Sequence, residues 1–213
     1  DFPQIGFEAE DLTVADFRRI TSMVAENHWI PAILDSLRAV KSADELAKIE
    51  TAARILDQAF AKILPQIRPG IAEHSLAAIL EYEMRQLGSE RTGFATIVAS
   101  GPRSALPHGV AADRLLATGD LVVFDFGAVY DGYHSDMTRT VCLGPASDRQ
   151  RQVYQTVLTA QMAGLAAVRA GALCRDVDRT ARDIIETAGY GEYFGHGLGH
   201  SVGLAIHESP RLS

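Results

Sequence analysis

The chain has 213 residues, of which 47% are hydrophobic and 22% are charged. These proportions exclude a disordered protein and allow one domain with a sizeable core, or one domain with a fragment of another. Lysine and arginine number 20 and aspartate and glutamate 27, so the formal net charge is −7. Such an acidic balance argues against nucleic acid or an anionic membrane as a partner, and no apolar run approaches the roughly 20 residues that span a bilayer.

Targeting and redox state can also be predicted from simple features of the sequence. The first residues, Asp-Phe-Pro-Gln, lack the charged start and apolar run of a signal peptide. Cys142 and Cys174 are far apart and form no CxxC motif. We therefore expect reduced, buried thiols in a cytoplasmic protein.

Apolar residues at helical spacing predict five helices, over residues 12–27, 42–64, 73–87, 147–170 and 175–188. The second and fourth begin with capping-box sequences, Ser42-Ala-Asp-Glu and Ser147-Asp-Arg-Gln. Short apolar runs over 94–99 and 121–126 are typical of strands, and a hairpin is predicted around Asp131-Gly132. The glycine-rich last 25 residues are expected to be strand and loop. The order helices, strands, helices, strands predicts an α+β domain with an internal pseudo-twofold.

Two aspartates stand inside the predicted hairpin strands, where an unpaired carboxylate is costly. If Tyr130 and Asp131 form a two-residue turn, Asp125 and Asp136 are cross-strand partners with Cβ atoms ~5 Å apart. A turn one residue longer shifts this register by one place. Two facing carboxylates can bracket a pair of metal ions. The alternative for the same pattern is two exposed aspartates near a turn.

Three histidines occur within twelve residues near the end of the chain, in His196-Gly-Leu-Gly-His200-Ser-Val-Gly-Leu-Ala-Ile-His207-Glu208. A single histidine is more often structural than a ligand, but three separated by glycine and apolar residues favour a metal or substrate site. The segment is not the HExxH signature of zinc proteases, because Arg211 stands three places after Glu208. His108, in Leu-Pro-His-Gly, is a fourth candidate.

Two short motifs point to other enzymes and are rejected. Asp125-Phe-Gly matches a kinase tripeptide, but no HRD motif or glycine-rich loop precedes it. The stretch 199–203 matches the G-x-S-x-G elbow of α/β-hydrolases, yet too few residues follow it to supply the acid and then the histidine in that order. A serine hydrolase remains the second chemical alternative.

Taken together, these residues resemble the pita-bread (creatinase/aminopeptidase-like) metallopeptidases: Xaa-Pro aminopeptidases, prolidases and methionine aminopeptidases. The resemblance runs from Leu37 to the end of the chain. It rests on Leu37-Arg-Ala-Val-Lys-Ser-x-x-Glu45, on Asp125-Phe-Gly-x-x-x-Asp-Gly-Tyr-x-Ser-Asp136-Met-Thr-Arg-Thr, and on the histidine segment. The sequences Gly-Tyr-x-Ser-Asp and His-Gly-Leu-Gly-His resemble those of the Xaa-Pro aminopeptidase and prolidase branch more than those of methionine aminopeptidases.

The resemblance implies a site for two divalent metal ions. Mn²⁺ is the metal we expect, with Co²⁺ or Zn²⁺ as alternatives. Asp125, Asp136 and His200 match its ligands, and a hydroxide bridging the two ions would attack the carbonyl before proline. His108 and His207 match positions that hydrogen-bond the substrate and the tetrahedral intermediate. His196 and Tyr133 match residues that line the site, for which structural support is an equal alternative.

The resemblance also implies a domain organisation. Residues 1–36 correspond to the tail of a creatinase-like N-terminal domain with its linker, and residues 37–213 to a catalytic domain whose C-terminal part is missing. The family supplies two further glutamate ligands, at positions that would follow Ser213. We therefore expect a pita-bread fold truncated at both ends, inactive by itself, from a homodimeric enzyme.

Two functions of different classes follow. The first is a metal-dependent exopeptidase that removes an N-terminal residue from peptides or dipeptides with proline second. The second is a non-catalytic binding protein with the same fold. Retention of Asp125, Asp136 and His200 favours the enzyme.

Overall fold

The computed structural model describes residues 4–9, 11–24, 28–32 and 35–213, and the chain divides into two compact units between Val40 and Lys41. In the first unit, strands β1 (Gln4–Phe7) and β2 (His28–Pro31) pair in parallel. Helix α1 (Val14–Met23) connects them, and the short helix α2 (Asp35–Arg38) follows. The ring of Phe17 on α1 lies 4.6 Å from that of Phe7 and 6.1 Å from that of Trp29, which fixes the helix on the two strands.

The sequence predicts the helix of this unit but not its strands. The helix expected over 12–27 is confirmed over Val14–Met23, and residues 25–27 lie outside the described residues. Strands of four residues are too short to show a clear alternation of polar and apolar side chains. The assignment of residues 1–36 to the tail of a separate domain remains a prediction.

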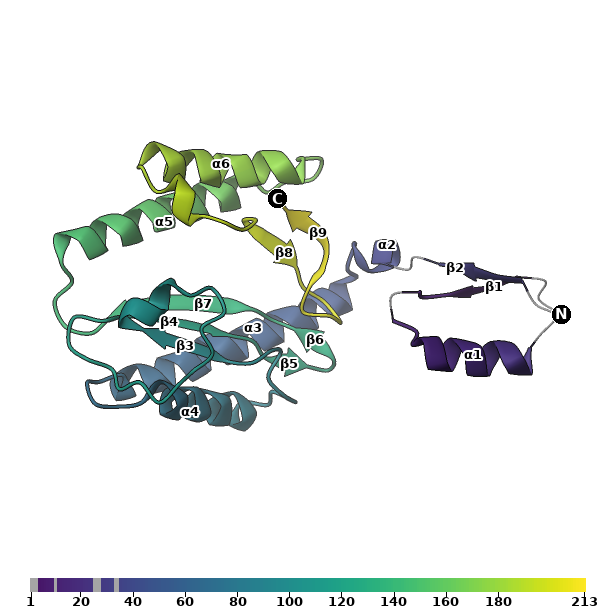
Figure 1. Cartoon of the computed structure of the whole chain (residues 1–213), viewed down its shortest axis with the longest axis horizontal. Coiled ribbons are helices and arrows are strands. Elements are labelled where there is room, and N and C mark those ends of the chain that lie inside the picture. Colours follow the sequence, from purple (N-terminus) through teal and green to yellow (C-terminus); the bar gives the residue numbers. More distant parts are fainter. Residues whose placement is uncertain (1–3, 10, 25–27, 33–34) are drawn as a thin grey trace. The chain divides into compact units, whose positions relative to one another are not determined.

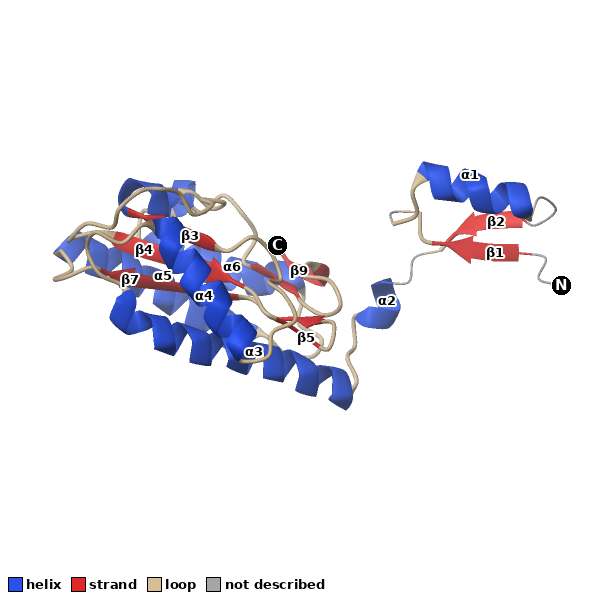
Figure 2. Ribbon diagram, turned by 90° about the horizontal axis from the view of Figure 1, so that it is seen from below, coloured by secondary structure: helices blue, strands red, loops and turns tan. Residues whose placement is uncertain are grey.

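The second unit begins with a helix pair that covers one face of a sheet. Helices α3 (Ala43–Ile63) and α4 (Glu73–Gln86) lie against the antiparallel strands β3 (Ile97–Ser100), β4 (Leu121–Phe126) and β7 (Met137–Cys142), with β4 in the centre (Figures 1 and 2). Alternate β4 side chains, Val122, Phe124 and Phe126, are fully buried in the core. The Phe60 ring contacts two of them, at centroid distances of 5.5 and 5.8 Å. Because side chains alternate along a strand, Asp125 points to the other face.

The rest of the second unit repeats this order of elements. Helices α5 (Asp148–Ala167) and α6 (Cys174–Thr187) pack together, and the antiparallel strands β8 (Gly199–Ser201) and β9 (Glu208–Leu212) follow (Figure 1). A smaller core of Ala160, Ala181 and Ile185 holds the helix pair together. The predicted α+β class and the order of its four blocks are confirmed.

The hairpin forms where it is predicted, but with a different register. Strands β5 (Val129–Tyr130) and β6 (Tyr133–His134) flank a turn at Asp131 and Gly132, whose φ angles are +47° and +81°. Positive φ at both central residues is what a type I′ turn requires. The predicted turn at Tyr130-Asp131 is therefore wrong by one residue. In consequence Asp125 pairs with Thr138, and Asp136 lies outside the ladder, in the interval between β6 and β7.

The other local predictions differ from the structure only at element ends. Both capping boxes form, at Ser42 with Glu45 and at Ser147 with Gln150. Strand β3 begins later than the predicted start at residue 94.

Cys142 and Cys174 are free, and both are half-buried where burial is expected. None of the helices in the described ranges has the length and apolar character needed to cross a membrane.

Candidate active site

Asp125 occupies the face of β4 that points away from the helix-covered core. Its cross-strand neighbours are Ile97 on β3 and Thr138 on β7, and the Thr138 hydroxyl donates to Oδ1 of Asp125 at 3.1 Å. Burial, and then the negative charge of Asp136, raises the pKa of Asp125 to about 6. A positive charge placed beside the Asp125 carboxylate would therefore stabilise its ionised form.

Asp136 follows the β6 strand and brings its carboxyl group to that of Asp125, close enough for the two to share a hydrogen bond. Burial raises the pKa of Asp136 as well, and the nearby His200 partly offsets this. The two aspartates are therefore neighbours, although they are not the cross-strand pair that the predicted register implies. Two half-buried carboxyl groups in contact repel each other when both are ionised, and a cation between them removes that repulsion.

His200 reaches this carboxyl pair from the other sheet. It lies on β8, and its Nε2 atom is 3.4 Å from Oδ2 of Asp136. Its ring centroid lies 4.4 Å from that of His207, which stands just before β9. Burial lowers the pKa of His207, and His200 lowers it further. A neutral imidazole offers one N–H donor and one acceptor nitrogen, the form suited to binding a substrate carbonyl.

His108 is brought to the same place by a loop that returns to the sheet. Val110 forms a bridge to Ile97, the residue opposite Asp125. The exposed His108 side chain is near enough for its charge to lower the pKa of both Asp125 and His207. The loop therefore brings His108 within two residues of the bridge to Ile97, the strand neighbour of Asp125.

A fully buried glutamate at the start of α4 holds this loop. The Glu73 carboxylate accepts hydrogen bonds from the backbone N–H and hydroxyl of Ser100, from Nε of Arg103 and from the backbone N–H of Ala112. A buried carboxylate with four donors fixes the groups that surround it. Glu73 thus anchors both ends of the segment that carries His108.

Tyr133 and His196 make contacts of another kind, directed to the helices that surround the site. The Tyr133 hydroxyl donates to Oε1 of Glu45 at 2.9 Å, at the start of α3. His196 is exposed, its ring packs edge-on against Phe194, and its backbone carbonyl accepts from Arg182 of α6 at 2.8 Å. These contacts fit structural support, and a direct role for either residue remains a prediction.

The donor set fits part of a metal site. Carboxylate oxygen and imidazole nitrogen are suitable ligands for divalent transition metals, and Asp125, Asp136 and His200 carry these groups, with His200 and Asp136 3.4 Å apart. Within the described residues, however, no group of three or more His, Cys, Asp or Glu side chains is arranged so that it could hold an ion. The ligand roles therefore remain predictions, and a complete site needs donors in addition to these three.

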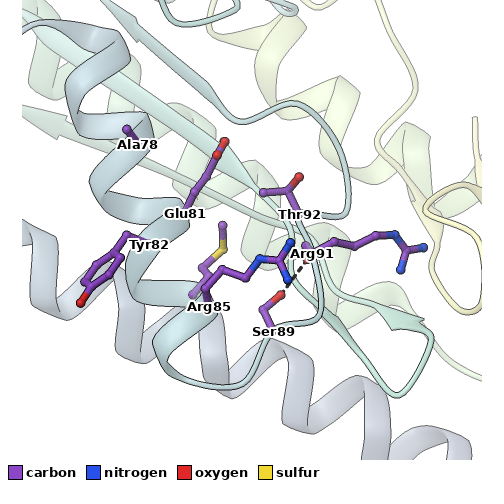
Figure 3. A pocket seen from close by; sticks show the side chains of 8 residues that line it. Ala78, Glu81, Tyr82, Arg85, Ser89, Arg91 and Thr92 are labelled. Carbon is purple, nitrogen blue, oxygen red and sulfur yellow. Dashed lines mark hydrogen bonds between the residues drawn. The ribbon is translucent and has the colours of Figure 1, made fainter.

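Two cavities elsewhere in the second unit do not mark this site. One, of about 410 Å³, lies at the end of α4, where Tyr82, Arg85, Ser89 and Arg91 line it (Figure 3). The other, of about 610 Å³, lies between β7 and α5. Neither is lined by any residue of the carboxyl and histidine cluster.

Sequence reasoning missed several residues that shape the cluster. Thr138 lies inside the hairpin motif that begins at Asp125, so its place in the motif could have indicated a contact with that aspartate. His134 is buried, and its backbone N–H donates to the carbonyl of Gly203 at 2.7 Å, which joins the hairpin to the histidine segment. Lys41 and Glu208 form an ion pair across the unit. No local pattern indicates such long-range partners.

Residues 47–213 match metallopeptidase family M24. The chain belongs to this family.

Individual M24 relatives agree in sequence and in structure. The Xaa-Pro dipeptidase of Pyrococcus furiosus is 46% identical over 192 residues, which are 90% of this chain and 55% of that protein. A solved Xaa-Pro dipeptidase from Bacillus anthracis superposes with a TM-score of 0.95 at 44% identity, over 99% of this chain and 59% of the other. An X-Pro aminopeptidase from Thermotoga maritima gives 0.94 at 44% identity, over 99% and 60%. The pita-bread architecture is thereby confirmed, and the chain spans about 55–60% of the length of these relatives.

Proposed function

We propose that the full-length protein is a metal-dependent exopeptidase that cleaves the bond before a proline in the second position of dipeptides or short peptides. The observation that carries the proposal is the distance of 3.4 Å between His200 Nε2 and Asp136 Oδ2. The charge of Asp136 also raises the pKa of Asp125, so the two aspartates belong to one cluster. M24 relatives named Xaa-Pro dipeptidase and X-Pro aminopeptidase support the substrate class. A non-catalytic protein would have no need of this costly carboxyl pair.

Asp125, Asp136 and His200 would hold the divalent ions, together with ligands from the rest of the protein. Ions bound there would supply Lewis-acid polarisation of the scissile carbonyl and a water molecule of lowered pKa. Thr138 orients Asp125 by donating to Oδ1, so the other carboxylate oxygen remains available. His207, whose pKa is lowered by burial, would donate a hydrogen bond from its ring to the carbonyl oxygen as negative charge develops there. His108 would bind the substrate from the opposite loop.

Three further features belong to the proposal. Mn²⁺ is the proposed metal, with Co²⁺ and Zn²⁺ as alternatives. A homodimer is the proposed assembly, and the cytoplasm is the proposed compartment, in keeping with the free thiols of Cys142 and Cys174.

The test is a hydrolysis assay of the purified full-length protein. The metal is stripped with a chelator, and Mn²⁺, Co²⁺ or Zn²⁺ is returned before Ala-Pro, Ala-Pro-Gly and Ala-Ala are supplied as substrates. We expect release of alanine from the proline-containing peptides only, dependent on metal, and absent in Asp136→Asn. Equal rates on Ala-Ala, or full activity without metal, would overturn the proposal. The ratio of dipeptide to tripeptide rates decides between dipeptidase and aminopeptidase.

A further inference from the structure

A buried ion pair joins the start of the second unit to the histidine segment. Nζ of Lys41 lies 2.8 Å from Oε2 of Glu208, and the two side chains are only 10% and 7% exposed. Buried charges are costly unless they are paired, so this ion pair ties the backbone at Lys41 to that at Glu208. Lys41 is the first residue of the unit, and Glu208 directly follows His207.

The Glu208 carboxylate also organises the turn in which His207 lies. Its Oε1 accepts the backbone N–H of Ala205 at 3.0 Å. The backbone N–H of Gly203 donates to the Ala205 carbonyl, also at 3.0 Å. The carboxylate lies so close to Gly203 that a Cβ there would be 2.4 Å from Oε2. The turn over residues 203–208 is therefore folded around the partner of Lys41.

The same helix start holds the aspartate hairpin. Glu45, in the first turn of α3, accepts the Tyr133 hydroxyl at 2.9 Å through Oε1. Through Oε2 it accepts the backbone N–H of Ser42 at 2.7 Å, which fixes the carboxylate in its capping box. These two hydrogen bonds, with a smaller contribution from the charge of Lys41, hold the pKa of Glu45 below its ordinary value. The hairpin is thus attached to the first turn of α3, and the histidine turn to Lys41, which lies two residues before that helix begins.

We propose that Lys41 and Glu45 are positioning residues, which fix the aspartate hairpin and the His207 turn relative to each other through Tyr133 and Glu208. We call Lys41, Glu45, Tyr133 and Glu208 the α3 bracket. The inference rests on the proposed function, since it concerns the placement of a histidine that acts on the substrate. Misplacement of a catalytic group by ~1 Å can lower a rate about 10²-fold. The bracket supplies the restraint against such a shift.

The chain offers a matched control for the ion pair. Lys62, at the other end of α3, pairs with Glu83 at the same distance of 2.8 Å, but its side chain is 49% exposed. Lys62→Met therefore removes a Lys–Glu contact of the same length, in a more exposed place at the far end of α3, without touching the histidine turn. Lys41→Arg keeps the charge, and Glu208→Gln keeps an oxygen for the Ala205 N–H while it removes the charge.

The experiment uses the full-length protein loaded with Mn²⁺ and reads two quantities. Hydrogen–deuterium exchange of peptides covering 199–208 reports the order of the turn, and kcat and KM for Ala-Pro report the placement of His207. We expect Lys41→Met and Glu208→Gln to speed exchange in 203–208 and to lower kcat ~10-fold or more with KM little changed. Lys41→Arg should retain most of the wild-type kcat. Lys62→Met should change neither the exchange of 203–208 nor kcat.

Each other outcome counts against the bracket. Unchanged exchange in 203–208, whatever the rate, or faster exchange with an unchanged kcat, overturns it. If Lys41→Met does not fold, Glu208→Gln and Lys41→Arg decide by the same two readouts. If the wild-type protein does not hydrolyse Ala-Pro, the proposed function fails. In that case faster exchange of 203–208 in Lys41→Met would still show that Lys41 holds the turn, and unchanged exchange would show that it does not.

Discussion

Nε2 of His200 lies 3.4 Å from Oδ2 of Asp136, across the gap between two separate antiparallel sheets. This separation is long for a strong hydrogen bond. Two donor atoms that share one ion at 2.0–2.2 Å are about 2.8–3.1 Å apart for octahedral and about 3.3–3.6 Å apart for tetrahedral ligation. The separation is therefore compatible with His200 and Asp136 being two ligands of a common ion.

The first prediction concerns how many ions residues 1–213 can hold. Two dications beside Asp125 and Asp136 leave about two positive charges uncompensated. A further carboxylate at ~3 Å contributes about 5 kcal/mol for each unit of positive charge on the ion at an effective dielectric of ~20. Since no group of three or more ligands is complete in the described residues, we expect this portion alone to bind at most one ion, weakly, and to hydrolyse no Xaa-Pro peptide.

Metal analysis by mass spectrometry after dialysis, on residues 1–213 and on the full-length protein, makes the measurement. The longer protein should retain two ions and release proline from Ala-Pro. Tight retention of two ions by residues 1–213 would mean that this portion contains ligands other than Asp125, Asp136 and His200.

The second prediction separates substrate binding from metal binding. In the full-length protein His108→Ala and His207→Ala should lower kcat/KM by about 10²-fold or more, because each removes a donor to developing charge. Metal content should stay near that of the wild type, since neither side chain is a proposed ligand. His200→Ala is the contrasting variant, in which metal should be lost together with activity. Loss of metal in the His207 variant would reverse its assigned role.

The sequence predicts much of the second unit because its signals are local. Capping boxes at Ser42 and Ser147 and the apolar pattern between them and the next proline or glycine depend on residues within a few turns of each other. Asp131-Gly132 is likewise a local hairpin signal. The cluster of Asp125, Asp136 and the histidines is also visible in the sequence, because carboxylates inside strands and closely spaced histidines are conspicuous.

What the sequence does not predict depends on distant partners or on a single residue of register. Which two residues form the turn decides whether Asp125 faces Asp136 or Thr138, and both choices leave the hydrophobic pattern acceptable. The pairing of Lys41 with Glu208 joins residues from opposite ends of the second unit. The role of Glu73 also becomes clear only when the chain has folded back around it.

The third prediction tests the close approach of Glu208 to Gly203. In Gly203→Ala the new Cβ would lie 2.4 Å from Oε2 of Glu208 and 2.6 Å from the carboxyl carbon. The carboxylate cannot retreat freely, since it is held by Lys41 and the Ala205 N–H. Overpacking of this kind typically costs about 1–3 kcal/mol.

Urea unfolding followed by circular dichroism measures that cost. Gly195→Ala is the control in the same segment, because a Cβ there meets no atom within 4 Å. We expect a lower unfolding midpoint for Gly203→Ala and little change for Gly195→Ala. Equal midpoints for the two variants would show that the turn yields easily and is not fixed by the Glu208 carboxylate.

The last prediction uses the pH dependence of a second ion pair, between Arg182 and the buried Asp178, which fastens the histidine segment to α6. The Asp178 carboxylate accepts hydrogen bonds from Nε and Nη2 of Arg182, at 2.8 and 3.0 Å, and from the backbone N–H of Leu198 at 2.8 Å. Arg182 first, and then Leu198, hold the pKa of Asp178 below its ordinary value, although burial opposes them. A carboxyl whose pKa is lower in the folded state stabilises the fold above its unfolded pKa, and this contribution is lost as the pH falls through the folded value.

Asp178→Asn should therefore lower the free energy of unfolding by about 2 kcal/mol at pH 7. The difference from the wild type should shrink as the pH falls below the unfolded aspartate pKa of about 3.9. Urea unfolding at several pH values between 7 and 2.5 gives this difference directly, since other titrating groups are common to both proteins. Asp183→Asn, on the exposed face of the same helix, should stay close to the wild type throughout. A wild-type advantage over Asp178→Asn that is constant with pH would mean that Asp178 acts by shape and hydrogen bonding alone, and that its charge does not hold the histidine segment on α6.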